Sequence, residues 1–169
     1  MMAAILCVLS PIGFPVGPIP WTLQTFAVAL SGFALGASDG SLAVAAYLLI
    51  GAAGAPVFGG MSAGIARFVG PTGGFLLAFP ATAAICGSGA GRGGMVRAAA
   101  SLAAMIPLYA LGCAQLGFAT GIPFAEALKV GAAPFAAKDV ASALLAAYAS
   151  SGVRRALGYA AGKRAAERP

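Results

Sequence analysis

Charged residues in this chain are separated by long apolar runs. No Asp, Glu, Lys or Arg occurs in residues 1–38, 40–66, 68–91 or 98–125, and residues 140–153 form a shorter uncharged run. A helix that spans a bilayer needs about 20 mainly apolar residues. Four prolines divide the first run, because proline lacks an N–H and clashes with the preceding helical turn. The pattern therefore predicts six membrane helices, at about 1–10, 21–36, 41–54, 71–87, 97–117 and 134–153.

The first predicted helix is short. At about 1.5 Å per residue, ten residues cover roughly half of a bilayer core. We therefore expect either that the helix continues to Phe14 or that the natural chain starts upstream of Met1. A signal peptide is disfavoured, because the segment lacks a basic start and a small-residue cleavage site.

Composition supports the membrane class. The chain of 169 residues is 60% hydrophobic and 8% charged, with a mean hydropathy of +0.94. Soluble domains carry about 25% charged residues. We expect one all-α integral membrane domain over residues 1–169.

The distribution of charge predicts an orientation. If the N-terminus is cytoplasmic, seven Lys and Arg residues lie inside, in the loop after the fourth helix and in a basic tail at 154–169. Three lie outside (Arg67, Lys129 and Lys138). This agrees with the positive-inside rule and predicts a multi-pass protein of the plasma membrane with both termini cytoplasmic. The tail suits anionic lipid. A nucleic-acid partner is disfavoured, since no basic patch interleaved with aromatic residues exists.

Residues for catalysis or metal binding are scarce. The chain has no histidine, three isolated cysteines and four acids (Asp39, Glu126, Asp139 and Glu167). Nucleophile–base pairs, paired carboxylates and metal-ligand clusters all lack their parts. We expect no metal, and a small intramembrane enzyme is disfavoured.

Residues 54–75 form a long, glycine-rich, apolar segment that is not helix-like. At membrane depth, irregular backbone is tolerated only where it is buried in protein or lines a cavity. Gly70-Pro71 fits a helix start, whose N–H groups at Gly73 and Gly74 would suit an anion or carbonyl. Arg67 could pair with a ligand carboxylate. The same residues would also fit an ordinary loop with a solvated arginine.

Lys138 and Asp139 are the second candidate feature. In a helix from 134 to 153 they lie in the first turns, near membrane depth, where charges are expensive and usually mark substrate sites. If the helix starts at Asp139, that residue is merely a cap.

Small residues at a spacing of four allow close helix packing in lipid. Gly32 with Gly36 and Ala3 with Cys7 lie well inside predicted helices.

Three segments resemble the BioY family, whose members are biotin-specific S-components of energy-coupling-factor (ECF) transporters. They are PIPWTLQTFAVALSGFALG (18–36), GAAGAPVFGGMSAGIARFVGPTGGFLLAF (51–79) and PFAAKDVASALLAA (134–147). The resemblance runs over nearly the whole chain, and its most specific strings are T-L-Q-T and P-V-F followed by G-P-T-G-G.

The resemblance implies the S-component fold of six membrane helices, with a biotin cavity near the outer face that the loop after the third helix helps to cover. It implies partnership with a transmembrane coupling subunit and two cytoplasmic ATPases, whose ATP hydrolysis topples the S-component and releases biotin. No cofactor is implied. The first helix in the family carries an A-x-x-x-A docking face, to which Ala3 and Cys7 are the nearest match.

One departure affects the site. In the family the last helix often opens with Asp followed three residues later by Lys. Here Asp139 matches the acid, Ser142 stands in the lysine position, and Lys138 precedes Asp139. Because one residue turns a helix by about 100°, Lys138 need not face the same cavity. Arg67 is therefore the better candidate for the biotin carboxylate.

The residues suggest roles toward biotin. Asp139 can accept bonds from the ureido N–H groups, the backbone of Gly73 and Gly74 can serve the carbonyl or the acid tail, and apolar walls can come from Phe58, Phe75 and Tyr109. The sequence also leaves two different functions open: an S-component for another vitamin, and a self-sufficient facilitator or channel.

Overall fold

The computed structural model describes residues 1–14 and 21–156, which are mostly helical. Two short strands, β1 (Gly13–Phe14) and β2 (Trp21–Thr22), pair antiparallel, with Gly13 opposite Thr22. The helices are α1 (Met2–Leu9), α2 (Gln24–Leu35), α3 (Ala37–Ala52), α4 (Ala66–Val69), α5 (Gly73–Ser88), α6 (Gly94–Thr120), α7 (Phe124–Gly131) and α8 (Ala133–Ala156).

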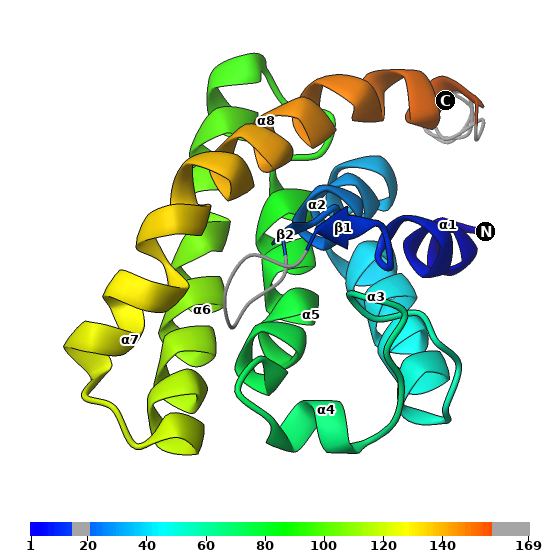
Figure 1. Ribbon diagram of the computed structural model, residues 1–169. Helices are drawn as coiled ribbons and strands as arrows, with labels where there is room; N and C mark the ends of the chain where they lie inside the picture. Colours follow the sequence, from blue (N-terminus) through cyan, green and yellow to red (C-terminus); the bar gives the residue numbers. More distant parts are fainter. Residues whose placement is uncertain (15–20, 157–169) are drawn as a thin grey trace, which may run out of the picture.

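The helices form a bundle in which α5 and α6 lie side by side, with α8 crossing α2 and α6 (Figure 1). Glycines allow the central helices to approach closely. A Cβ on Gly32 of α2 would overlap the carbonyl of Ala83 on α5, and one on Gly87 of α5 would overlap the backbone at Ala37. Gly32 therefore serves the close packing that its spacing predicts, whereas Gly36 ends α2 with a positive φ of 95°.

The all-helical class is confirmed, and four expectations of local structure need correction. The first helix does not continue to Phe14, because α1 ends at Leu9 and Phe14 belongs to β1. The helix predicted from Pro71 starts at Gly73, with Thr72 as its N-cap residue. Helix α8 starts at Ala133, which confirms the helix predicted from about residue 134 and not the alternative start at Asp139, so Asp139 lies in the second turn and is not a cap. The other two corrections are elements that the apolar pattern did not predict, namely helices α4 and α7.

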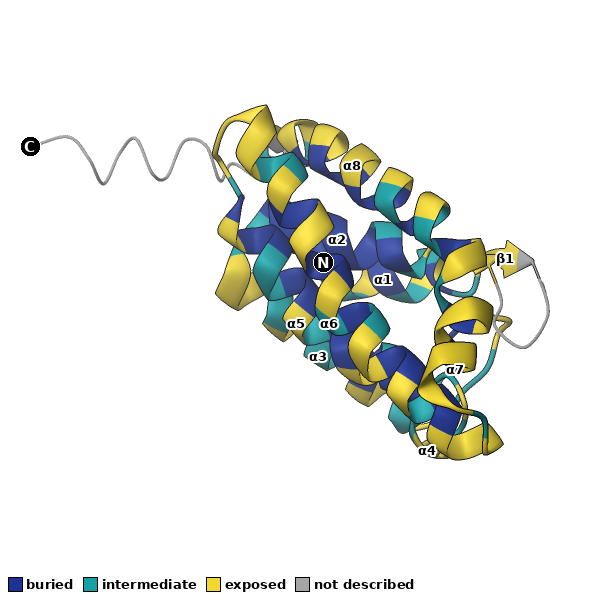
Figure 2. Cartoon of the chain, turned by 90° about the vertical axis from the view of Figure 1, so that its left-hand side faces the viewer, coloured by how far each residue is buried: buried dark blue, intermediate teal, exposed yellow. Residues whose placement is uncertain are grey.

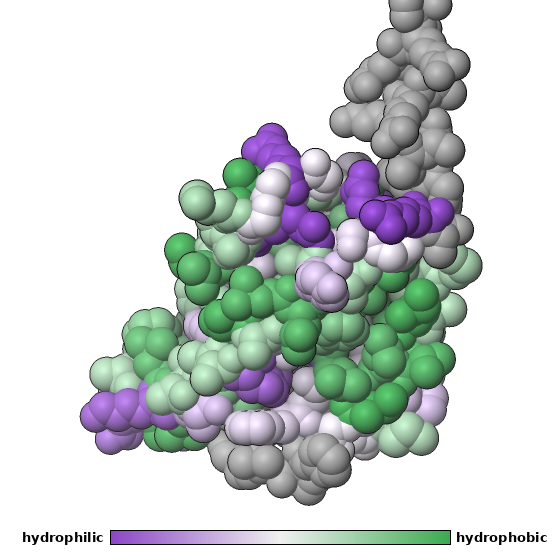
Figure 3. Space-filling model, turned by 90° about the horizontal axis from the view of Figure 1, so that it is seen from above, coloured by the Kyte–Doolittle hydropathy of each residue, from purple (hydrophilic) through white to green (hydrophobic). Residues whose placement is uncertain are grey.

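The surface of the bundle is strongly apolar. Large side chains such as Leu42, Ile106 and Leu145 are at least 62% exposed. Hydrophobic residues form broad areas in the view from above, with hydrophilic residues in a few separate groups (Figure 3). Along α8, buried and exposed residues alternate, so one side faces the bundle and the other faces out (Figure 2). Continuous exposed apolar surface of this kind is typical of contact with a membrane or a partner.

Length and hydropathy identify few complete spans among the described residues. Helix α6 is long and apolar enough to cross a bilayer by itself, and α7 with α8 passes the same test as one span bent by 54°. Helices α2, α3 and α5 are apolar but have 12 to 16 residues, fewer than the roughly 20 that a perpendicular span needs. The count of six spans stays a prediction.

Candidate functional site

A small cavity lies between α2, α5, α6 and α8, and Gly131, the last residue of α7, also contributes to its lining. Its two kinds of wall differ in chemistry. The polar wall consists of Thr22, Gln24, Thr25, Lys138 and Asp139, and the apolar wall of Phe75, Phe79, Leu108, Gly131 and Phe135. A few polar groups in an otherwise apolar pocket are typical of a small-molecule site.

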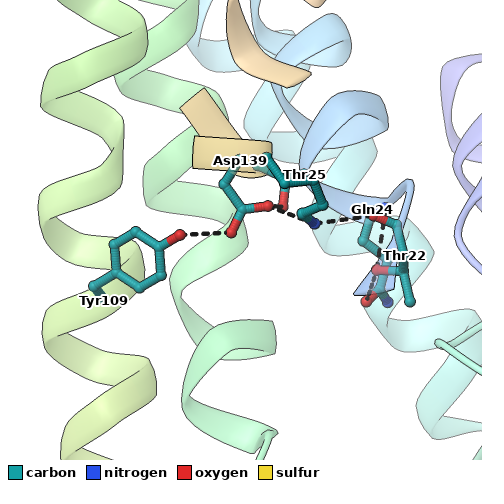
Figure 4. Close-up of polar contacts among 6 residues, drawn as sticks. Thr22, Gln24, Thr25, Tyr109 and Asp139 are labelled. Carbon is teal, nitrogen blue, oxygen red and sulfur yellow. Dashed lines mark hydrogen bonds and ion pairs between the residues drawn. The ribbon is translucent and has the colours of Figure 1, made fainter. Parts of the chain in front are cut away.

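Asp139 is the centre of the polar wall. It is 5% exposed, and its two carboxylate oxygens each accept a hydrogen bond. The Thr25 hydroxyl donates to Oδ1 at 2.8 Å and the Tyr109 hydroxyl donates to Oδ2 at 2.7 Å. The donors come from α2 and α6, so the carboxylate of α8 joins three helices (Figure 4). A buried charge needs such partners, since its desolvation is expensive.

Lys138 faces the same cavity as Asp139, contrary to the expectation from helix geometry. Its Nζ lies 2.6 Å from Oδ1 of Asp139 and donates to the carbonyl oxygen of Thr22 at 3.1 Å. The 100° argument fixes where the lysine Cα lies, but its flexible four-carbon stem brings the ammonium back to the neighbouring carboxylate. The cavity therefore contains an ion pair whose two charges cancel.

The start of α2, together with Thr22 of β2, supplies the rest of the polar wall. Gln24 accepts a hydrogen bond from the Thr22 hydroxyl at 3.1 Å and donates through Nε2 to the Tyr47 hydroxyl at 2.9 Å. These residues were not predicted as site residues, although T-L-Q-T carried the family resemblance. The available signal was three polar side chains within four residues, at the start of an apolar helix.

Two of the predicted aromatic residues lie at the cavity. Phe75 lines it, and its ring packs edge-on against Tyr109 with a centroid distance of 6.4 Å. Tyr109 contributes its hydroxyl to Asp139. Phe79, Leu108 and Phe135 complete the apolar wall and were not predicted, because nothing in their spacing separates them from ordinary helix-packing residues. Trp21 packs against Phe135 at 6.1 Å.

Gly73 and Gly74 lie outside the cavity lining, at the start of α5. A Cβ on Gly73 would overlap the Phe68 carbonyl, and one on Gly74 would overlap the carbonyl of Leu111 on α6. The Gly73 N–H donates to the Gly70 carbonyl at 3.0 Å, so this amide is already paired. Both glycines therefore allow close contact between protein segments.

Arg67 and Phe58 also lie outside the cavity lining. Arg67 is exposed on the short helix α4. Phe58 is 2% exposed and packs edge-on against Tyr47 at 5.6 Å and Phe68 at 5.7 Å. It therefore anchors the loop after α3 to the bundle. Ala3 and Cys7 are both partly exposed on α1, which packs against α2 and α3 through Met2 and Leu6.

The fold is a helical bundle with a strongly apolar surface, and its cavity combines polar and apolar groups, as small-molecule sites commonly do. A carboxylate and an ammonium can exchange their mutual contact for contacts with such a molecule, because each gains a new partner as it loses the old one. The chain belongs to the BioY family, whose model matches residues 1–159, and it is therefore a membrane protein of a transporter family.

Several curated proteins and one solved structure are similar over most of their length. The chain is 39% identical to a probable biotin transporter BioY of Pyrococcus horikoshii, with 86% of this chain and 87% of that protein covered. It is 37% identical to the biotin transporter BioY2 of Lactococcus lactis, with 93% and 88% covered. The crystal structure of the S-component for biotin from an ECF-type ABC transporter matches with a TM-score of 0.79 and 28% identity, over 91% of this chain and 85% of that one.

Proposed function

We propose that this chain is the biotin-binding S-component of an ECF vitamin uptake transporter. The observation that carries the proposal is the Lys138–Asp139 ion pair in a cavity with a polar and an apolar wall. Relatives named as biotin transporters and the similarity to a biotin S-component support the choice of ligand.

Biotin has groups that complement the two walls. Its ureido N–H groups are donors that suit the Asp139 carboxylate and the Gln24 amide oxygen, while its fused rings suit Phe75, Phe79 and Phe135. Its acid tail suits Lys138, the one cation that lines this cavity among the described residues. We therefore assign the carboxylate contact to Lys138 in preference to Arg67, whose exposed position on α4 supports a solvated role.

The cavity must widen to hold this ligand. Its volume is about 50 Å³, whereas small-molecule pockets typically measure about 300–1,000 Å³. Lys138 is the lining side chain with the most rotamer freedom, and 20% of its side chain is exposed. When Lys138 moves from Asp139 to an entering carboxylate, the cavity widens and the ammonium gains a new partner in the same step.

The transport setting follows from the same proposal. Six helices span the plasma membrane with both termini cytoplasmic, and the basic tail at 154–169, of which residues 157–169 lie outside the described part of the chain, contacts anionic lipid. The chain itself is not an enzyme and needs no cofactor. A transmembrane coupling subunit docks on the face of α1 that contains Ala3 and Cys7, and two cytoplasmic ATPases hydrolyse ATP. The partial exposure of Ala3 and Cys7 supports this docking face.

Calorimetric titration of the detergent-purified protein tests the proposal, first with biotin and then with biotin methyl ester. Tight binding of biotin that esterification weakens is the expected result, because the ester removes the charge that Lys138 recognises. Equal binding of both would keep the ligand and remove Lys138 from its role.

No binding of biotin by a folded sample would refute the assigned ligand, and a panel of other vitamins would then follow. Sustained uptake into vesicles that lack the coupling subunit and ATPases would favour a self-sufficient facilitator.

A further inference from the structure

Tyr47 of α3 lies behind the polar wall of the cavity. Its side chain is fully buried, at 0% exposure, and does not line the cavity. The hydroxyl joins two segments that are far apart in sequence. It accepts a hydrogen bond from Gln24 Nε2 at 2.9 Å, and it donates to the Val57 carbonyl at 3.2 Å.

The chemistry of these groups fixes the direction of every bond in the chain. A carbonyl oxygen has no hydrogen to donate, so the Tyr47 hydroxyl must use its one hydrogen toward Val57. The tyrosine oxygen is then an acceptor, and Gln24 must present its NH₂ group to it. The other end of the Gln24 amide, Oε1, consequently points to the Thr22 hydroxyl, from which it accepts at 3.1 Å.

The orientation of Gln24 decides what the cavity offers to a ligand. An amide can present either a donor or an acceptor, and a flip exchanges the two. Gln24 lines the cavity beside Asp139, whose carboxylate is also an acceptor. Two neighbouring acceptors, Gln24 Oε1 and the Asp139 carboxylate, are complementary to a ligand with N–H donors, whereas a flipped Gln24 would oppose such donors with its own N–H groups.

The same hydroxyl holds the loop between α3 and α4. Val57 belongs to this loop, and the neighbouring Phe58 ring packs edge-on against the Tyr47 ring. Gly51 makes room for this contact, since a Cβ there would overlap the Phe58 ring. Phe58 in turn packs against Phe68 of α4. The Val57 carbonyl therefore reaches Tyr47 in a loop position that the aromatic contacts also fix.

We infer that Tyr47 is a positioning residue that sets the Gln24 amide as an acceptor toward the ligand and ties this orientation to the seated position of the loop at residues 53–65. The ligand side of this inference rests on the proposed biotin function. The loop side does not, because it concerns contacts within the protein alone.

The first test is Tyr47→Phe, which keeps the ring contacts and removes the hydroxyl. The matched control is Tyr148→Phe, which makes the same change at a residue that is 84% exposed. We expect Tyr47→Phe to raise the Kd for biotin about tenfold, the effect of losing one buried hydrogen-bond partner, and Tyr148→Phe to leave it within about twofold. The ratio of the Kd values for biotin and its methyl ester should stay at the parent value, since Lys138 meets this chain of bonds only at the Thr22 backbone carbonyl, which the substitution leaves in place.

A double-mutant cycle separates positioning from general destabilisation. In a Gln24→Ala background the amide is absent, so adding Tyr47→Phe should change the biotin Kd by no more than about twofold. Additive losses would overturn the inference, because Tyr47 would then act by a route that does not pass through Gln24.

A ligand-free measurement tests the loop. Arg67 is exposed directly after the loop, so the rate of tryptic cleavage after Arg67, followed by mass spectrometry, reports release of this segment. Tyr47→Phe should accelerate this cut severalfold relative to the parent and to Tyr148→Phe. An unchanged rate would overturn the tie to the loop. If the parent chain itself fails to bind biotin, the proposed function fails together with the ligand side, and the cleavage rates still decide the loop side.

Discussion

The two ends of α8 both place a cation against α2, with opposite consequences. At one end Lys138 donates to the carbonyl of Thr22, just before α2 begins, and pairs with Asp139. At the other end Arg154 donates to the carbonyls of Phe33 and Ala34, where α2 finishes. Arg97 of α6 joins this second end, since it donates to Ser150 on α8 and lies over the Phe33 ring at 5.6 Å.

The helix dipole explains the difference. The end of a helix has carbonyl groups without helical partners and a partial negative charge, so Arg154 satisfies α2 and is satisfied by it. The start of a helix carries partial positive charge, which favours Asp139 and disfavours Lys138. The arginine end is therefore a structural clamp. The lysine end contains a cation that depends on Asp139, which leaves it suited to exchange that partner for a ligand anion.

The largest effect on binding is expected from Asp139→Asn. The substitution keeps the shape and lets the Thr25 and Tyr109 hydroxyls rotate to new partners, but it removes the charge that accepts ligand N–H groups and balances Lys138. Hydrogen bonds to charged groups contribute about 1.5–3 kcal/mol, so the biotin Kd measured by calorimetry should rise about 10- to 100-fold. Parent-like binding by Asp139→Asn would remove this carboxylate from the site.

A smaller loss is expected from Lys138→Met, which keeps the apolar stem and removes the ammonium. The biotin Kd should rise about tenfold, because one charge-assisted contact is lost while the buried Asp139 loses its partner. Biotin and its methyl ester should then bind equally well, and this loss of discrimination is the sharper measurement. A variant that still prefers the acid would place the carboxylate contact elsewhere.

The arginine end should respond in stability and not in binding. Arg154→Ala removes donors from the end of α2, and an effect of about 1.5–3 kcal/mol lowers an apparent Tm by about 3–10 °C in a chain of this size. The biotin Kd should stay within about twofold. Arg155→Ala is the matched control, because Arg155 is exposed one residue further along α8. Equal Tm values for the two variants would contradict the clamp.

The helical class and the charged centre of the cavity could be predicted from sequence for the same physical reason. Charges are so scarce in this chain that Lys138 and Asp139, placed inside an apolar run, need a special environment. Phe75 and Tyr109 could also be predicted as site residues, because they lie on the apolar helices expected around this pair. Thr22, Gln24 and Tyr47 carry no comparable signal, because hydroxyl and amide side chains are ordinary residues near helix starts and within helices.

The glycine-rich segment shows where sequence reasoning ends. Glycine permits close approach of backbone to a ligand and equally of helix to helix. Gly74 uses this freedom toward Leu111 of α6, and Gly51 uses it toward Phe58. The choice between these uses depends on which segments the tertiary fold brings together. The direction of a side chain on α4 such as Arg67 depends on the same information, as does the packing of Phe58 against α3.

The smallest effect is expected from Arg67→Ala. This substitution tests whether Arg67 of α4 or Lys138 of α8 contacts the biotin carboxylate. Arg67 is exposed and does not line the cavity, and exposed charges contribute about 0–1 kcal/mol even to a contact they make. The biotin Kd and the preference for biotin over its methyl ester should both stay at the parent values. The opposite result, in which Arg67→Ala removes that preference and Lys138→Met keeps it, would show that Arg67 moves to the biotin carboxylate when biotin binds. Lys138 would then pair with Asp139 both with and without biotin. The two ends of α8 would both make structural contacts, which would differ only in how strongly they stabilise the protein.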